Sequence, residues 1–186
     1  MNFDNEKKQT LEKIDHSKKG SIDKQILSLI KKINSYPDYY TTSSCAGRIL
    51  LIKKAEKKHE AEWLLSSHET VTYEEVKEKL NELPEKTVWF RMESPIIHLC
   101  TRTMEDADKI MLAANKAGLR RTGIISFRKR IVVELFIPEK MDVPISKDKK
   151  LLVDEDYLKY IIDLANNKLK KSRKRLKKFE KEFLSL

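Results

Sequence analysis

The chain has 186 residues, with 39 Lys and Arg against 29 Asp and Glu, a formal net charge of +10 and a pI near 9.4. Hydrophobic residues make up 40%, which is enough for a folded core and excludes global disorder. No uninterrupted apolar run reaches ~18 residues, which excludes a transmembrane helix, and the polar start at Met1–Glu6 has no apolar signal region. We therefore expect a single cytoplasmic domain over residues 1–186, with a basic C-terminal helix at 154–183 packed on it.

The cysteines and glycines exclude several familiar kinds of site. Cys45 and Cys100 are too few for a disulfide scaffold, so we expect free thiols. No two glycines have the spacing of a dinucleotide or nucleoside loop. Gly118 and Gly123 have the spacing of a phosphate loop, but the Lys-Ser/Thr that this loop requires does not follow them. Both standard nucleotide-binding loops are therefore excluded.

The N-terminal part of the chain predicts helices followed by extended chain. Residues 4–19 carry apolar residues at helical spacing, and Gly20 is predicted to end this helix. A second helix is predicted to begin at Ser21, with apolar residues at every third or fourth position, and to end in a turn-forming cluster. Residues 39–53 are rich in Thr, Tyr and Ile, which is typical of a strand, and the small residues at 43–47 predict a bend.

The rest of the chain alternates between strand and helix patterns. Strands are expected at 62–68, 88–101, 122–127 and 130–137, and helices at 72–83, 103–117 and 154–183. Thr72 and Glu75 form a capping-box pattern, and Pro95 requires an edge strand, a bulge or a break into two strands. Residues 144–150 are predicted to be a polar loop. The pattern indicates an α+β fold with a mixed or mainly antiparallel sheet and flanking helices, not a Rossmann methyltransferase fold.

The densest group of reactive side chains follows Tyr39 and Tyr40. The segment Ser43-Ser44-Cys45-Ala46-Gly47-Arg48 combines hydroxyls, a thiol, a permissive glycine and a guanidinium. Burying such hydroxyls without partners costs ~1–3 kcal/mol each, so a core strand is a poor interpretation. At a bend they would offer donors to an anionic ligand, which Arg48 could hold through two hydrogen bonds. A polar edge strand with a turn remains the alternative.

Histidines and one glutamate form a second group. His98 and Cys100 share one face of a regular strand, and with Cys45 and His68 they could compose a Cys2His2 zinc site, although the usual closely spaced cysteine pair is missing. A strand histidine is more often a hydrogen-bonded structural residue than a catalyst. Glu93 would need a partner if it is buried, and it could act as a general base.

The C-terminal helix carries a dense positive charge. Residues 168–178 contain eight cations and no anion. Such runs are usually solvated faces, but like charges four residues apart destabilise a helix. A basic helix face that binds phosphates is the better interpretation.

Several segments, in a consistent order over most of the chain, resemble the tRNA wybutosine-synthesising methyltransferases, which catalyse the third step of that pathway in eukaryotes and have archaeal relatives. The segments are Tyr39–Ile49, Trp63-Leu64, Ser67-His68, Met92–His98, Ala117–Ile124 and Ala165–Lys168. The Ser-Ser-Cys-x-Gly-Arg element is the specific one. Ala46 departs from the family, which often has a second serine there, so a hydroxyl at this position is not essential or not shared.

The resemblance implies S-adenosylmethionine-dependent methylation of N4 in a 4-demethylwyosine-type base next to the anticodon of tRNA-Phe. It gives S-adenosylmethionine as the cofactor and the tRNA-Phe anticodon stem–loop as the partner, with no metal, membrane or obligate protein partner. On this interpretation the residues that bind the cofactor are Ser43, Ser44, Cys45 and Arg48, and the proton-acceptor or base-orienting residues are His68, Glu93 and His98, which the sequence does not rank. The RNA-binding residues are Tyr39, Tyr40, Arg120, Arg121, Lys171, Arg173, Lys174 and Arg175, with a tyrosine stacking on the extruded base.

Two other functions remain open on the sequence. A non-catalytic RNA-binding module needs only the basic helix and the tyrosines. A metal-assisted hydrolase or deaminase would use the cysteine and histidine set.

Overall fold

The computed structural model describes residues 2–12, 22–53 and 62–186, and the chain divides into two compact units. Unit 1 comprises Met1–Ala46, Pro95–Pro138 and Arg173–Leu186, and unit 2 comprises Gly47–Ser94 and Glu139–Ser172. Each unit has its own sheet and its own hydrophobic core. The expectation of one domain over the whole chain remains a prediction.

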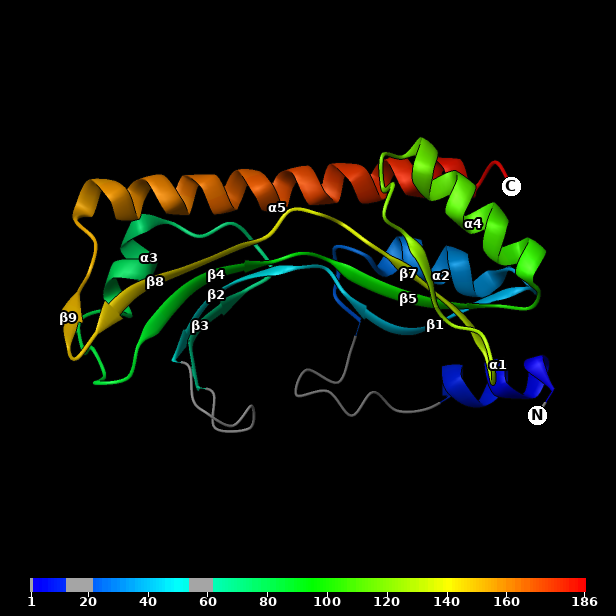
Figure 1. Cartoon of the computed structure of the whole chain (residues 1–186), viewed down its shortest axis with the longest axis horizontal. Helices are drawn as coiled ribbons and strands as arrows, with labels where there is room; N and C mark the ends of the chain where they lie inside the picture. The colour runs from blue at the N-terminus through cyan, green and yellow to red at the C-terminus, as the bar shows by residue number, and fades with distance from the viewer. Residues whose placement is uncertain (1, 13–21, 54–61) are drawn as a thin grey trace. The chain divides into compact units, whose positions relative to one another are not determined.

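Unit 1 contains a four-stranded antiparallel sheet in the order β1-β5-β7-β6. Its strands are β1 (Tyr39–Cys45), β5 (Ile96–Thr101), β6 (Gly123–Ser126) and β7 (Ile131–Leu135), and its helices are α1 (Phe3–Glu12), α2 (Leu27–Ser35) and α4 (Met104–Lys116). Figure 1 shows α1 on one face of this sheet and α4 on the other.

The core of unit 1 lies between one sheet face and its helices. Side chains alternate along a strand, so β5 turns Ile97 and Leu99 to the face that α2 and α4 cover, and both are fully buried. On the opposite face, Tyr40 packs edge-on against Phe3 of α1, with ring centroids 5.2 Å apart. On the same face, the polar side chains of Ser43, His98 and Glu134 remain at least partly exposed.

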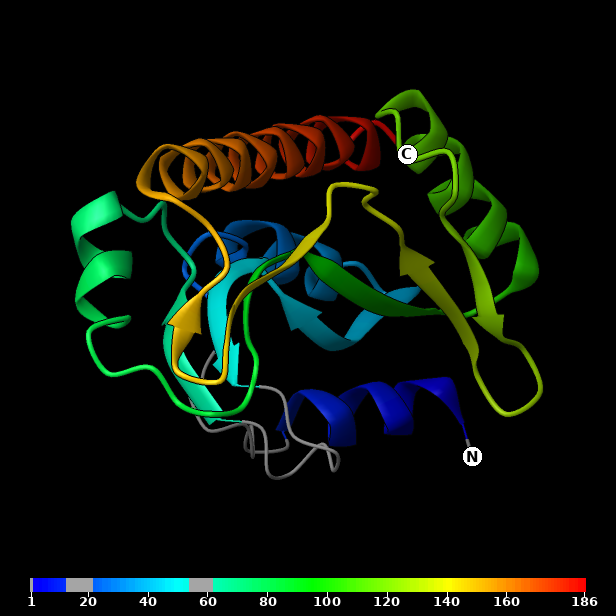
Figure 2. The ribbon, with the colours of Figure 1, turned by 60° about the vertical axis from the view of Figure 1, so that its left-hand side comes forward.

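Unit 2 contains a five-stranded antiparallel sheet in the order β3-β2-β4-β8-β9. Its strands are β2 (Arg48–Lys53), β3 (Glu62–Ser67), β4 (Val88–Glu93), β8 (Met141–Lys147) and β9 (Lys150–Leu151), and its short helix is α3 (Tyr73–Glu78) (Figure 2). Alternation along β2 and β4 directs Ile49, Leu51, Phe90 and Met92 into the core.

The last helix, α5 (Glu155–Phe183), supplies buried residues to both cores. Its predicted stripe is confirmed. Leu158, Ile161, Ile162, Ala165 and Leu169 lie in the core of unit 2, and Leu176, Phe179 and Phe183 lie in the core of unit 1. Asp154 begins the helix, because its carboxylate accepts from Tyr157 N at 2.8 Å. Within the described ranges, no helix is both long and apolar enough to cross a membrane.

Most of the predicted elements are confirmed, as is the α+β class with antiparallel sheets. Thr72 and Glu75 form the predicted capping box, and the chain breaks at Pro95 into β4 and β5, which belong to different sheets. Helix α4 ends before Gly118, whose φ of +84° suits a residue without a side chain. The expected boundary between two helices at Gly20 and Ser21 lies outside the described residues.

Three boundaries were predicted wrongly. The expected loop at 144–150 is a hairpin of β8 and β9, in which Asp148 and Lys149 adopt positive φ angles of 50° and 60° and turn the chain within two residues. Helix α2 begins only at Leu27, because the segment before it places Asp23 against the backbone of another segment. Helix α3 ends at Glu78, short of the predicted residue 83.

Candidate functional site

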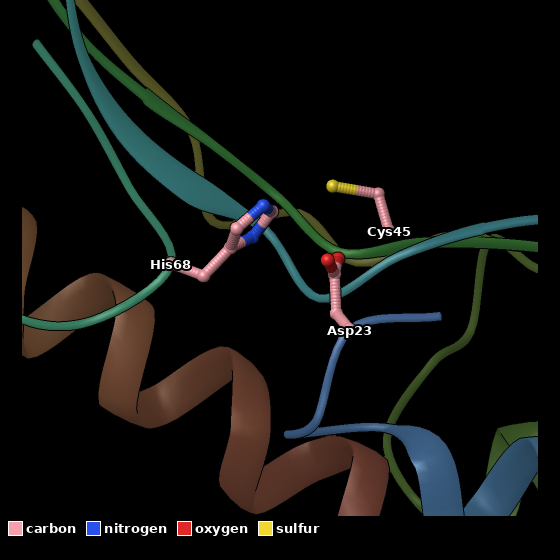
Figure 3. Close-up of side chains that lie close together, drawn as sticks. All are labelled: Asp23, Cys45 and His68. Atoms are coloured by element: carbon pink, nitrogen blue, oxygen red, sulfur yellow. The ribbon is translucent and has the colours of Figure 1, made fainter. Parts of the chain in front are cut away.

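The end of β1 in unit 1 carries the predicted hydroxyl and thiol cluster. Ser43 is exposed, and Ser44 and Cys45 are half-buried. Asp23, which is only 7% exposed, accepts a hydrogen bond from Ala46 N at 2.8 Å and so holds the strand end in place. Its carboxylate and the Cys45 thiol lie within 4.8 Å of each other (Figure 3). These side chains are therefore ordered by a buried carboxylate that sequence reasoning missed.

A polar row crosses the part of the unit 1 sheet that α1 leaves uncovered. In the strand register, Ser43 of β1 lies opposite His98 of β5, which lies opposite Glu134 of β7. Residues paired across strands face the same side of a sheet, so the three side chains are neighbours. His98 Nε2 lies 2.7 Å from Glu134 Oε2, and the two side chains remain 24% and 30% exposed. The row is thus accessible.

The His98–Glu134 contact determines which ring nitrogen can accept a proton. A carboxylate only accepts hydrogen bonds, so Nε2 carries the proton in the neutral ring and Nδ1 keeps its lone pair. When Nδ1 takes up a proton, the adjacent carboxylate stabilises the resulting imidazolium. Glu134 was missed in the sequence, where its only signal is a charge in the middle of the apolar strand Ile131–Leu135.

Cys100 lies apart from this chemistry. It is buried opposite Tyr40, and burial raises the pKa of its thiol. Within the described part of unit 1, neither Cys100 nor His98 joins a group of three possible metal ligands. The suggested Cys2His2 zinc site therefore has no support from these two residues.

The two tyrosines predicted to stack on RNA lie inside unit 1. Tyr39 is 5% exposed and Tyr40 is fully buried. Burial raises the pKa of Tyr39 to about 12, and it also raises that of Tyr40, whose hydroxyl contacts Glu6 Oε2 at 3.3 Å. Both rings are used in packing, so we assign neither of them a stacking role below.

Arg48 and Glu93 form an ion pair on the sheet face of unit 2 that points away from its core. Arg48 Nε lies 2.8 Å from Glu93 Oε2, and its guanidinium lies over the Trp63 ring at 4.4 Å from the centroid. Arg91 contacts Glu93 at 3.8 Å and binds the Asp142 carboxylate with two hydrogen bonds, of 3.1 and 2.8 Å. These four charged residues make a continuous ladder in which each charge faces an opposite one.

His68 of unit 2 is half-buried at the end of β3. Its Nδ1 lies 2.8 Å from the Gly47 carbonyl oxygen. A carbonyl only accepts, so Nδ1 carries the proton in the neutral ring and Nε2 keeps the lone pair.

The basic run of α5 forms a distinct helix face. Five exposed lysines fall within about 120° of arc at 3.6 residues per turn. They are Lys170, Lys171, Lys174, Lys177 and Lys178. The buried residues of the helix lie on the opposite side of its circumference. Lys171 contacts Glu139 at 3.6 Å, whereas the other four have no carboxylate within 4.0 Å among the described residues.

A second set of cations in unit 1 lies close to this helix. Arg175 Nη1 donates to the Gly118 carbonyl at 3.4 Å, and the exposed Arg120 and Arg121 follow in the same loop. The Arg121 guanidinium lies over the Phe136 ring at 4.7 Å from the centroid. Arg173 is half-buried on the helix. Two basic sets that are distant in sequence therefore meet in unit 1.

A model of the family described as Methyltransferase TYW3 matches residues 5–185. The chain belongs to this family. The resemblance found in the sequence is thereby confirmed. The family name implies a methyl donor, because methyl transfer requires one.

Relatives of this TYW3 family member match most or all of its length. A Thermococcus sibiricus protein named tRNA(Phe) 7-((3-amino-3-carboxypropyl)-4-demethylwyosine(37)-N(4))-methyltransferase is 39% identical over 100% of this chain and 96% of its own length. A Bos taurus protein named tRNA wybutosine-synthesizing protein 3 homolog is 30% identical over 93% and 69%. A solved structure from Pyrococcus horikoshii has a TM-score of 0.90 at 34% identity and covers 99% and 95% of the two chains. Another, from Aeropyrum pernix, has a TM-score of 0.74 at 29% identity over 86% and 96%.

Proposed function

We propose that this protein methylates N4 of a 4-demethylwyosine-type base at the position 3′ to the anticodon of tRNA-Phe. The observation that carries the proposal is the full-length match to a relative named for this reaction on 7-(3-amino-3-carboxypropyl)-4-demethylwyosine. The basic face of α5 and the accessible His98–Glu134 pair are consistent with an enzyme that acts on RNA. The same proposal assigns the protein to the cytoplasm.

We propose S-adenosylmethionine as the methyl donor, which supplies an electrophilic methyl group when it is bound. The donor types at the end of β1 suit such a ligand, because Ser43 and Ser44 offer hydroxyls and Cys45 offers a polarizable surface. In unit 2, Arg48 suits a carboxylate, since its guanidinium is held by Glu93 and Trp63 in a defined orientation. We assign Ser43, Ser44 and Cys45 of unit 1 to cofactor binding, and we keep Arg48 of unit 2 as a separate candidate for binding a carboxylate.

We propose His98 as the general base and Glu134 as its positioning residue. The N4 nitrogen must lose a proton when it acquires the methyl group, and Nδ1 of His98 is the acceptor. Glu134 holds the ring and stabilises the imidazolium that forms. His68 is a second proton-acceptor candidate. Glu93 is a third, although its carboxylate is already engaged by two arginines.

We propose that tRNA phosphates bind the exposed cations of α5 and the loop at Arg120 and Arg121. Lysines without carboxylate partners are available to phosphates, and each contact made releases counterions. Lys171 and Lys174 are exposed on this face, and the half-buried Arg173 and Arg175 flank it. Replacing Lys174 and Lys178 with glutamine should reduce the salt slope of tRNA binding by about two.

Nucleoside mass spectrometry tests the proposed reaction. The purified protein is incubated with tRNA-Phe carrying the 4-demethylwyosine-type base, with and without S-adenosylmethionine. We expect a gain of one methyl group that depends on both the protein and the donor. The fragment pattern should place that methyl group on N4.

The failure of this experiment has a defined meaning. If tRNA binds but no methylated nucleoside forms, the protein is a non-catalytic RNA-binding module and the proposed reaction is wrong. Calorimetry with S-adenosylmethionine alone separates a failure of cofactor binding from a failure of catalysis.

A further inference from the structure

The hairpin of β6 and β7 in unit 1 has a tip with unusual surface chemistry. The tip Phe127-Arg128-Lys129-Arg130 lies beyond the paired residues of the two strands, and all four of its side chains are exposed (Figure 2). Phe127 is 69% exposed, the highest value among the large hydrophobic residues of the described chain. An aromatic ring in that position contributes little to the core.

A bulge in the hairpin adds a second exposed apolar side chain. Ile124 pairs with Val133 and Ser126 pairs with Val132, so Ile125 is an extra residue without a cross-strand partner. A bulge of this kind re-aims the side chain it contains. Ile125 is consequently 55% exposed, and it lies two residues from Phe127 along an edge strand.

The cations at the tip are largely uncompensated. Arg130 approaches Glu6 at 3.9 Å, which leaves it near a carboxylate. Among the described residues, no carboxylate lies within 4.0 Å of Arg128 or Lys129. An exposed aromatic ring can stack on a flat group, and the two neighbouring cations attract negative charge. Together they favour a ligand that is both flat and anionic.

We propose that this hairpin tip is an RNA-contacting element, in which Phe127 stacks on an unpaired base while Arg128 and Lys129 contact the adjoining phosphates. Unpaired RNA combines exposed base faces with a charged backbone, and stacking on an aromatic side chain is its usual mode of recognition. Duplex RNA hides its base faces and offers phosphates, 2′-hydroxyls and base edges, on which an aromatic ring cannot stack. The inference rests on the proposed function, because it assumes an RNA substrate. It adds a contact that would distinguish unpaired RNA from duplex RNA.

Replacing the ring while keeping an apolar side chain tests the proposal. Binding of the full-length wild type, Phe127→Leu and Phe127→Trp is measured to the tRNA-Phe anticodon stem–loop and to a duplex of the same stem sequence without the loop. We expect Phe127→Leu to weaken stem–loop binding by about 5- to 150-fold, the range for loss of one base–aromatic stack. Phe127→Trp should bind within about twofold of wild type, and no variant should change duplex binding.

Several outcomes would overturn the inference. Unchanged stem–loop binding by Phe127→Leu shows that the ring does not stack. Equal losses by Phe127→Leu and Phe127→Trp indicate that binding depends on the shape of the side chain and not on stacking. A parallel loss on the duplex indicates a general effect on phosphate binding.

Two further measurements complete the design. All three proteins should unfold at the same temperature, because the side chain is mostly exposed. Methylation by the wild type is followed in the same samples. If the wild type methylates tRNA-Phe and Phe127→Leu binds normally, only the hairpin inference fails; if methylation is absent while the ring still matters for binding, only the proposed reaction fails.

Discussion

The two sheets of this protein place different polar rows on the faces that point away from their cores. In unit 1, the row ends in an imidazole paired with one carboxylate, His98 and Glu134. In unit 2, the row alternates Arg48, Glu93, Arg91 and Asp142, so that every charge has an opposite neighbour. Both rows are partly exposed, and both cross several strands.

The difference lies in what each row can do with a proton. The ladder in unit 2 is electrically complete, and adding a proton to Glu93 would leave Arg48 and Arg91 without their shared anion. The pair in unit 1 leaves Nδ1 of His98 with its lone pair, because Glu134 contacts only Nε2. A satisfied charge network therefore positions side chains, whereas the histidine–carboxylate pair is suited to proton transfer.

The substitution His98→Gln should have the largest effect if this comparison is right. Single-turnover methylation should slow by about 10²- to 10⁴-fold, the usual contribution of a general base. Affinity for tRNA-Phe should stay within about twofold, because the residue is not part of the basic face. A rate loss smaller than about tenfold would assign proton removal to another group, and His68→Gln is the matched test of that alternative.

Glu134→Gln should have a smaller effect on the same rate. A hydrogen bond to a charged group contributes about 1.5–3 kcal/mol, which corresponds to roughly 10- to 100-fold in rate when it forms in the transition state. Nitrogen NMR of the imidazole supplies a readout that a packing defect would not produce. The tautomer is measured in a second variant, Glu134→Leu, because the amide oxygen of a glutamine could still accept from Nε2. We expect the preference for a proton on Nε2 to weaken in Glu134→Leu, and an unchanged tautomer there would remove Glu134 from its positioning role.

The opposite behaviour is expected of Glu93→Gln in unit 2. The free energy of unfolding should fall by about 1 kcal/mol, because two partly exposed arginines lose their shared anion. Methylation at saturating substrate should remain within about threefold of wild type. Chemical denaturation and the methylation assay are run on one preparation. A hundredfold loss of rate with normal stability would show that Glu93 takes part in catalysis rather than in stability.

Asp106, which lies in neither polar row, should give the smallest effect. It serves as a reference for the effect of one carboxylate on the free energy of unfolding. Burial alone would raise the pKa of Asp106, but hydrogen bonds from Lys109 and Thr103 outweigh it and lower that pKa below its usual value of 3.8. The ionised Asp106 carboxylate therefore contributes to the free energy of unfolding at pH values above 3.8. This contribution is lost as the pH falls through the lower pKa of the folded state. Asp106→Asn should cost about 0.3–1 kcal/mol at pH 7, as expected for an acid at a helix N-terminus.

Denaturation at several pH values checks this reference. The difference in unfolding free energy between wild type and Asp106→Asn should shrink as the pH drops below 4. A difference that stays constant between pH 7 and pH 3 would mean that the charge of Asp106 contributes nothing. The methylation rate should not change in this variant.

Local chemistry made much of the fold predictable. The capping box at Thr72, the break at Pro95 and the apolar stripe of α5 each depend on residues that are close in sequence, and all three are confirmed. The family signature likewise identified the end of β1. The turn at Asp148 and Lys149 was missed because neither residue is a glycine or asparagine, which are the usual signals for positive φ angles.

The partners of the site residues were less predictable, because strand pairing is non-local. Glu134 lies 36 residues from His98, and Asp23 lies 23 residues from Ala46. No spacing rule in the sequence relates either pair. The burial of Tyr39 and Tyr40 also depends on which sheet face α1 and α5 cover, and composition alone does not reveal this.

The use of α5 by both cores bears on how cooperatively the protein unfolds. Both cores draw buried side chains from this one helix. Melting of α5 would therefore remove buried apolar contacts from both cores at once, so we expect a single unfolding transition rather than two.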